Sequence, residues 1–191
     1  MEKIMIEKEV FTFDEVREKA LEKNFYVNHY DGWDDGIICS WNDKLAEYGF
    51  CNPEIHYSGF SYQCNGACFD CDQYHIDLDA ILDNLDLTED EKERIYNLKD
   101  KFEVIIDTIE HHYNHEYTRT VDVRRYIDDA DDDALLDKFE NLLEEFRIWL
   151  CQQIYEDLDN KFWYIVSDDA IEESIKNCLF NEDGTIFEYR E

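Results

Sequence analysis

Four residues in the middle of the chain carry the side chains that a tetrahedral zinc site uses. They are Cys64, Cys68, Cys71 and His75, and thiolates with one imidazole can complete such a site. Zinc knuckles and ribbons use paired Cys-x-x-Cys hooks, whereas here a single hook exists, at Cys68 and Cys71. Cys64 and Cys68 also flank the turn expected at Asn65-Gly66. The spacing therefore favours reduced thiols packed beside a hairpin, with a zinc site as the alternative.

A second group of reactive side chains consists of His111, His112, His115 and Glu116. Histidines at a turn can bind a metal or act as general bases, but no Gly-x-Ser-x-Gly nucleophile elbow accompanies them. Their order also differs from the helical His-Glu-x-x-His zinc motif. We expect them to form the polar tip of a hairpin.

Carboxylates are too abundant to identify a catalytic pair. The 191 residues include 49 Asp and Glu against 18 Lys and Arg, a formal net charge of -31. Neighbouring acids such as Asp168 and Asp169 therefore arise from composition alone. The six glycines form neither a Walker loop nor a dinucleotide-binding loop. The sequence predicts no enzyme and no cofactor.

Basic residues are too few and scattered to bind nucleic acid directly. Their one local concentration is Arg119, Arg124 and Arg125, for which we expect internal ion pairs with the acidic surface.

Two acidic groups are more distinctive. Asp128-Asp129-Ala130-Asp131-Asp132-Asp133 places five carboxylates in six residues, and a second group lies near residue 31. The ordinary interpretation is a solvated loop and helix start. The functional interpretation is that ordered carboxylates imitate DNA phosphates and bind a protein that normally neutralises phosphates with Lys and Arg. An EF-hand is a poor match, because the run lacks the glycine and terminal glutamate of that loop. The residues assigned to partner binding are Asp31, Asp34, Asp35, Asp128, Asp129, Asp131, Asp132 and Asp133.

Helices are predicted where an N-cap residue precedes apolar residues at helical spacing. Capping boxes begin helices at Thr12 and at Thr88, and Ser167 caps a last helix that carries Ile171, Ile175 and Leu179. Further helices are expected over 34–48 and 78–85. The longest helix should follow the acidic run and form the backbone of the core. Its apolar stripe comprises Leu135, Leu136, Phe139, Leu142, Leu143, Phe146, Trp149, Leu150, Ile154, Leu158 and Phe162.

Strand-like segments pair into two predicted hairpins. The first joins a strand from residue 54 to one over 67–76, and the second joins 102–110 to 116–123. Asp183-Gly184 would turn the chain into a terminal strand over 185–189. These elements predict an α+β fold in which helices pack on one face of an antiparallel sheet of four or five strands.

Composition indicates one folded domain over residues 1–191. Hydrophobic residues make up 44% and aromatic residues 15%, which is too much for a disordered acidic tail. One proline and six glycines leave no linker composition. No apolar run approaches the roughly 20 residues of a membrane span, and seven cysteines, an odd number, indicate reduced thiols. We expect a cytoplasmic protein.

The segment Ser58-Gly59-Phe60-Ser61-Tyr62-Gln63-Cys64-Asn65-Gly66-Ala67-Cys68-Phe69 resembles the signature of a family of bacteriophage-encoded acidic proteins, often labelled antitoxin-like or hypothetical. Similar stretches follow in order along most of the chain, among them Val10 to Glu15, His112 to His115, Trp149 to Glu156 and Ser167 to Gly184. The resemblance implies a phage or mobile-element origin, expression inside a bacterial host and no established catalytic residues. Cys64 and Cys71 stand where that family has polar residues, which argues against a metal site common to the family.

Three functional hypotheses result. The first is a non-catalytic inhibitor of a basic, nucleic-acid-binding host protein, such as a restriction, CRISPR or toxin component; an antitoxin is a related alternative. The second is a protein that sequesters a small ligand or metal, in a pocket formed by Ser58, Phe60, Gln63, His112 and His115. The third is a hydrolase of unrecognised type, which no motif supports. The apolar stripe of the long helix would also allow a homodimer.

Overall fold

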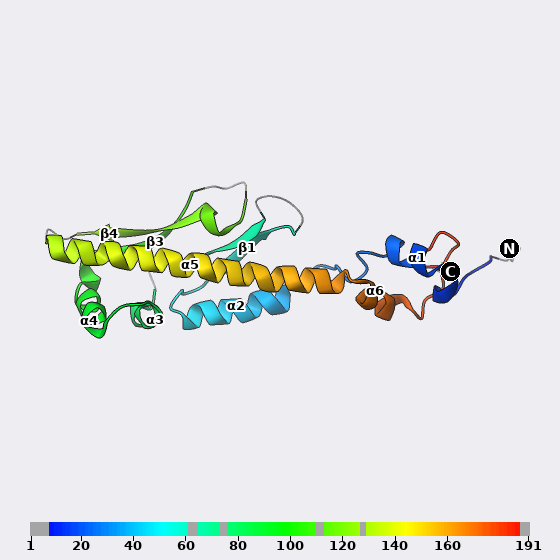
Figure 1. Ribbon diagram of the computed structural model, residues 1–191, viewed down its shortest axis with the longest axis horizontal. Coiled ribbons are helices and arrows are strands. Elements are labelled where there is room, and N and C mark those ends of the chain that lie inside the picture. The colour runs from blue at the N-terminus through cyan, green and yellow to red at the C-terminus, as the bar shows by residue number, and fades with distance from the viewer. Residues whose placement is uncertain (1–7, 61–64, 73–75, 110–112, 127–128, 188–191) are drawn as a thin grey trace, which may run out of the picture. The chain divides into compact units, whose positions relative to one another are not determined.

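The computed structural model describes residues 8–60, 65–72, 76–109, 113–126 and 129–187, and all structural statements below concern these residues. The chain divides into two compact units (Figure 1). Unit 1 combines Met1–Trp33 with Asn160–Glu191, and unit 2 is Asp34–Asp159. The class is α+β, as predicted.

Unit 2 contains two antiparallel hairpins. In the first, β1 (Glu54–Ser58) pairs with β2 (Gly66–Asp70), so that His56 lies opposite Cys68. In the second, β3 (Phe102–Thr108) pairs with β4 (Arg119–Arg125), so that Val104 lies opposite Val123. Both hairpins are predicted by the sequence, although β2 ends at Asp70 rather than extending to residue 76.

The described strands form two sheets of two strands each, in place of the single larger sheet that we expected. One of the two edges of the second hairpin, that of β4, is covered by side chains. There the Val121 amide donates to Glu144 Oε2 at 3.0 Å and the Val123 amide donates to Glu140 Oε1 at 3.3 Å. These carboxylates occupy the donors that another strand would need, so β4 cannot pair on that side.

Helix α5 (Ala130–Ile165) is the longest element, and Figure 1 draws the four strands along one side of it and α2, α3 and α4 along the other. It begins at Ala130, so the acidic residues 131–133 form its first turn rather than preceding it. Most of the predicted apolar stripe is buried, including Phe139, Leu143 and Ile154. Trp149 departs from the prediction, because its side chain is 46% exposed.

Shorter helices complete unit 2. They are α2 (Asp35–Glu47), α3 (Leu78–Asp83) and α4 (Glu89–Asn97), followed by the 3₁₀ turns η1 (Lys99–Lys101) and η2 (Glu116–Thr118). The Thr88 capping box forms as predicted: Glu91 Oε2 accepts from the Thr88 amide at 2.9 Å, and the Glu91 amide donates to Thr88 Oγ1 at 3.3 Å. The structure adds that Asp77 caps α3 by accepting from the Ala80 amide.

Unit 1 packs α1 (Phe13–Lys23) and α6 (Asp168–Ile175) around a small apolar core. The core comprises Phe13, Val16, Ala20, Leu21, Ile171, Ile175 and Phe180. Leu179, expected to point inward, is 48% exposed. In the described part of the predicted terminal strand, residues 185–187, Ile186 forms a single bridge to Phe180, which also bridges Phe11; residues 188 and 189 lie outside the described residues. No helix in the described part of the chain is long and apolar enough to cross a membrane.

Candidate functional site

Two described residues of the signature segment, Ser58 and Gly66, contact Asn114 and His115 in the connection between β3 and β4. A Cβ atom at Gly66 would lie 2.4 Å from His115 Cβ, so only glycine permits this approach. The Asn114 amide donates to Ser58 Oγ at 2.9 Å across the same contact. Packing between the two hairpins thus explains why the signature segment has glycine at position 66.

The residues of the predicted ligand pocket are only partly described. Ser58 and His115 do lie near each other, but their polar atoms bond to the protein itself: Ser58 Oγ accepts from Asn114, and His115 Nδ1 accepts from the Tyr117 amide at 3.1 Å. The Phe60 ring stacks on Tyr155 with centroids 5.7 Å apart. Gln63 and His112 lie outside the described residues.

The candidate zinc ligands are only partly described. Cys68 is buried in β2, and Cys71 follows the end of that strand at Asp70. Cys64 and His75 lie outside the described residues, and the described part contains no group of three or more His, Cys, Asp or Glu side chains that could hold a metal ion. Burial raises the pKa of Cys68 and raises that of Cys71 to about 12. Protonated, shielded thiols are poor metal ligands and nucleophiles.

A buried polar centre, which sequence reasoning missed, fills the space between β2, η2, β4 and α5. Its main cation is Arg147, whose side chain is fully buried. Arg147 Nε and Nη2 each donate to Glu144 at 2.8 Å, and Nη2 also donates to the carbonyls of Glu116 at 2.7 Å and Arg119 at 3.0 Å. The guanidinium therefore fastens η2 and the start of β4 to α5.

Arg119 forms the second half of the buried polar centre. Its Nε and Nη2 donate to the two carboxylate oxygens of Asp70 at 2.6 and 3.1 Å, a bidentate pair that His56 Nε2 joins at 3.1 Å. Burial by itself would raise the pKa of Asp70, but Arg119 and His56 together lower that pKa. Cys151, next to Arg147, has its pKa raised to about 12 by burial. These charges are paired and the thiol is protonated, so the arrangement is that of a structural centre.

The predicted acidic run is split between structure and surface. Asp132 pairs with Arg94 at 2.9 Å and Asp133 with Arg125 at 3.1 Å. Asp129 Oδ1 accepts from the amides of Asp131 and Asp132 and so caps α5. The Asp131 side chain forms no hydrogen bond or ion pair within the described residues, and Asp128 lies outside them.

The second predicted group, near residue 31, is divided between the two units. Asp31 is an exposed residue of unit 1, whereas Asp34 and Asp35 belong to unit 2. Asp34 Oδ2 accepts from the Tyr57 hydroxyl at 2.8 Å, which raises the pKa of Tyr57 in addition to the effect of burial. Asp35 is exposed in the first turn of α2.

The arginines pair as predicted. Arg119 binds Asp70, and Arg124 binds Asp107 and Asp122. Arg125 binds Asp133, Asp137 and Glu140. Each arginine that the structure describes forms an ion pair with a carboxylate of its own chain. The described pairs are completed by Arg17 with Glu172, Arg94 with Asp132 and Arg147 with Glu144.

An acidic hollow of about 330 Å³ lies between α3 and α4, and it was not predicted. It is lined by Asp79, Leu82, Asp83, Glu89, Asp90, Lys92, Glu93 and Tyr96. Its one cation, Lys92, already lies 3.5 Å from Asp83 and 3.3 Å from Glu89. Outside this lining, Arg94 of α4 donates to Asp132 in the first turn of α5 at 2.9 Å. Acidic side chains therefore occur on α3, on α4 and at the start of α5.

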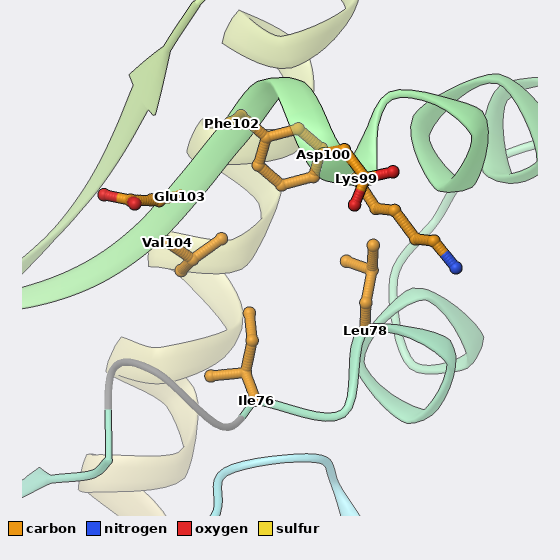
Figure 2. Close-up of a pocket in the computed structure, with 7 residues that line it drawn as sticks. All are labelled: Ile76, Leu78, Lys99, Asp100, Phe102, Glu103 and Val104. Carbon is orange, nitrogen blue, oxygen red and sulfur yellow. The ribbon is translucent and has the colours of Figure 1, made fainter.

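A second hollow, also of about 330 Å³, lies beside β3 (Figure 2). Ile76 and Leu78 face Phe102 and Val104 across it, and we call it the edge groove. Lys99, Asp100 and Glu103 complete its lining. Its walls are thus apolar and its rim is charged.

Comparison with known proteins adds a family but no activity. No curated protein matches the chain, and no solved structure matches it. The family described as Domain of unknown function (DUF8835) matches residues 33–168, which is most of the chain and covers α2 to α5 with both hairpins. The chain therefore belongs to the DUF8835 family.

Proposed function

We propose that this protein is a non-catalytic, acidic interaction protein that inhibits a basic, nucleic-acid-binding protein of a bacterial host by occupying its phosphate-binding surface. The sequence resemblance to phage-encoded proteins suggests the setting, which is counter-defence against a restriction, CRISPR or toxin component. The proposed binding surface is the acidic hollow together with the start of α5.

The observation that carries this proposal is that the described arginines are ion-paired within the chain. Every arginine in the described part of the chain is bound to a carboxylate of the same chain. Arginine is the residue best suited to bind phosphate, so a protein whose described arginines are all engaged is poorly equipped to bind nucleic acid itself. The surplus of carboxylates instead favours a cationic partner, with attraction that falls as salt increases.

The shape of the acidic hollow supports a protein partner. Asp79, Asp90 and Glu93 line it and form no ion pair with any described residue. Their carboxylates surround a concave space at fixed positions on two capped helices, where an Arg or Lys side chain of the partner could enter. Ordered carboxylates of this kind can replace phosphates in contacts with Arg and Lys.

The proposal is tested with a triple variant, Asp90→Asn, Glu93→Gln and Asp131→Asn, because none of these carboxylates has a described ion pair. The matched control neutralises three exposed acids elsewhere in unit 2, Asp43→Asn, Glu47→Gln and Glu156→Gln. Tagged wild-type protein is first used to capture and identify a partner from a bacterial host, and the purified partner is then titrated with each variant and with duplex DNA.

The expected result is that the triple variant binds at least tenfold more weakly, that the control binds like wild type, and that DNA competes with the wild-type protein. Binding should also weaken between low and high salt. A complex that is insensitive to salt, or a control variant that loses as much affinity as the triple variant, would contradict the proposed surface.

A further inference from the structure

The alternating hydrogen-bond pattern of the second hairpin identifies which main-chain N–H and C=O groups of β3 point away from β4. The Val121 and Val123 amides donate to α5 carboxylates, so the residues of β4 that bond to β3 are Thr120, Asp122 and Arg124. Their register partners in β3 are Asp107, Ile105 and Glu103. The hydrogen bonds that extend the ladder agree with this parity: the Ile109 amide donates to the Thr118 carbonyl, and the Tyr126 amide donates to the Lys101 carbonyl. The main-chain groups of Val104 and Ile106 therefore point outward.

These outward groups form the free edge of β3. No hydrogen bond to the main-chain N–H or C=O of Val104 or Ile106 is formed within the described part of the chain. Yet Val104 is only 4% exposed, and buried main-chain groups in folded proteins are nearly always paired. The contrast with β4 is direct, since Glu140 and Glu144 cover that edge. Among the described residues, no main-chain group and no carboxylate bonds to the edge of β3, so of the two edges it is the candidate for pairing with another strand.

The edge groove adjoins the start of this free edge, at Val104. Its lining comes from β3, from η1 and from the segment that leads into α3, and includes no residue of β4 or α5. The groove therefore lies on the side of β3 that faces away from β4, where Figure 2 shows Ile76 pointing toward Val104 and Leu78 pointing toward Phe102 and Lys99. A strand added here would have its main chain beside β3 and every second side chain near Ile76, Leu78 and Val104.

The charged side chains of β3 indicate which residue types an added strand would carry at its other positions. Glu103 and Asp107 are exposed on the face opposite to Val104, where Glu103 accepts from the Tyr126 hydroxyl at 3.1 Å and Asp107 lies 3.7 Å from the exposed Arg124. Side chains of an added strand that lie on this outer face would be cross-strand neighbours of these two carboxylates, which favours Lys or Arg there. A second copy of β3 would instead bring like charges together in a protein that carries a net charge of -31.

We propose that the free edge of β3 and the edge groove bind an extended segment of a partner protein, in which apolar and basic residues alternate. The apolar side chains enter the edge groove, the basic ones meet Glu103 and Asp107, and the main chain bonds to Val104 and Ile106. This mode of recognition is strand addition to an exposed sheet edge. This proposal rests on the proposed function in one respect, which is that the partner is basic. The surface it uses is different from the acidic hollow.

The probe is a short capped peptide of alternating lysine and valine, titrated into the full-length isotope-labelled protein. Amide chemical shifts and hydrogen exchange are followed by NMR. We expect the largest shifts at Val104 and Ile106, with exchange of both amides slowed about tenfold or more. The same peptide with N-methyl groups on alternate residues has equal charge but cannot complete the ladder, and it should bind at least fivefold more weakly.

Two protein variants distinguish the contribution of the Ile106 main-chain N–H to peptide binding from the contribution of its side chain. Ile106→Pro removes the outward N–H without removing a bond to β4, and proline is tolerated at sheet edges; it should weaken binding of the lysine-valine peptide about fivefold to tenfold. Ile106→Val retains that N–H and should bind within twofold of wild type. If Ile106→Pro fails to fold, which its own amide spectrum would reveal, the N-methylated peptide provides the same comparison on the wild-type protein.

The proposal is overturned if saturating peptide leaves the Val104 and Ile106 amides unperturbed, or if the N-methylated peptide binds as tightly as its parent. It is also overturned if these amides become protected with rising protein concentration in the absence of peptide, because the edge would then pair with a second copy. The triple variant at Asp90, Glu93 and Asp131 should bind the peptide like wild type. A failure of the edge proposal is thereby distinguished from a failure of the acidic-hollow proposal.

Discussion

Replacement of Arg147 by methionine should destabilise the protein more than any loss of an exposed ion pair. The change removes the guanidinium from a fully buried position and leaves the Glu116 and Arg119 carbonyls and the Glu144 carboxylate without their main donor. Removing one partner of a buried ion pair costs roughly 3–5 kcal/mol. The Glu144 side chain is 27% exposed and also accepts from Val121, so water and that amide offset part of the loss. We therefore expect the free energy of unfolding to fall by about 3 kcal/mol.

The measurement is urea unfolding at neutral pH, followed by circular dichroism and tryptophan fluorescence. Urea is preferred because guanidinium chloride is a salt and would screen the charges under test. The control is Arg124→Met, which removes an arginine that is also ion-paired, with Asp107 and Asp122, but is 52% exposed. That variant should lose less than about 1 kcal/mol.

A double-mutant cycle with Glu144→Gln isolates the pair. If Arg147 acts through Glu144, the second substitution should cost less in the Arg147→Met background than in wild type, by about 1 kcal/mol or more. If Arg147→Met loses less than about 1 kcal/mol, or loses no more than Arg124→Met, the reasoning that this guanidinium fastens η2 and β4 to α5 is refuted.

Two further predictions concern the same region of unit 2. The folded-state pKa of Asp70 is lowered, so its charge stabilises the fold above its unfolded pKa of about 3.9 and this contribution is lost as the pH falls below that value. Asp70→Asn should thus be less stable than wild type at pH 7 in urea unfolding, with the difference shrinking at pH 3; an unchanged difference would show that the charge is not the cause. Gly66→Ala should cost about 1–3 kcal/mol in the same assay, because its Cβ would meet His115 at 2.4 Å. Gly59→Ala, whose Cβ has no heavy atom within 4 Å, should change stability by less than about 0.5 kcal/mol, and equal losses at the two glycines would contradict the packing argument.

Local signals in the sequence predicted most of the elements. The capping boxes at Thr12 and Thr88 begin α1 and α4 within the residues that the spacing indicates, because a cap depends on side chains three positions apart. The number of strands per sheet depends instead on contacts far apart in the chain. Glu140 and Glu144 of α5 accept from the amides at the edge of β4. No residue near β4 in the sequence predicts these two hydrogen bonds.

The burial of Arg147 could have been predicted. Leu143, Arg147, Leu150 and Ile154 follow one another at helical spacing, which places the arginine in the middle of the apolar stripe. A charged residue at a core position indicates a buried partner, and Glu144 lies one turn away on the same helix. The acidic hollow had no such signal, because its lining comes from two helices whose packing the sequence does not state.

The large negative charge and the buried polar centre have a common physical basis. Self-repulsion among surface carboxylates opposes a compact fold, and cations weaken that repulsion most effectively where water screens them least. Arg119 and Arg147 are buried beside carboxylates inside unit 2, and neither lines the acidic hollow. Conversion of either residue to a neutral one should therefore make stability more dependent on salt than it is in wild type. Such a change would connect the interior arginines to the tolerance of an anionic surface, and equal salt dependence would restrict their role to local hydrogen bonding.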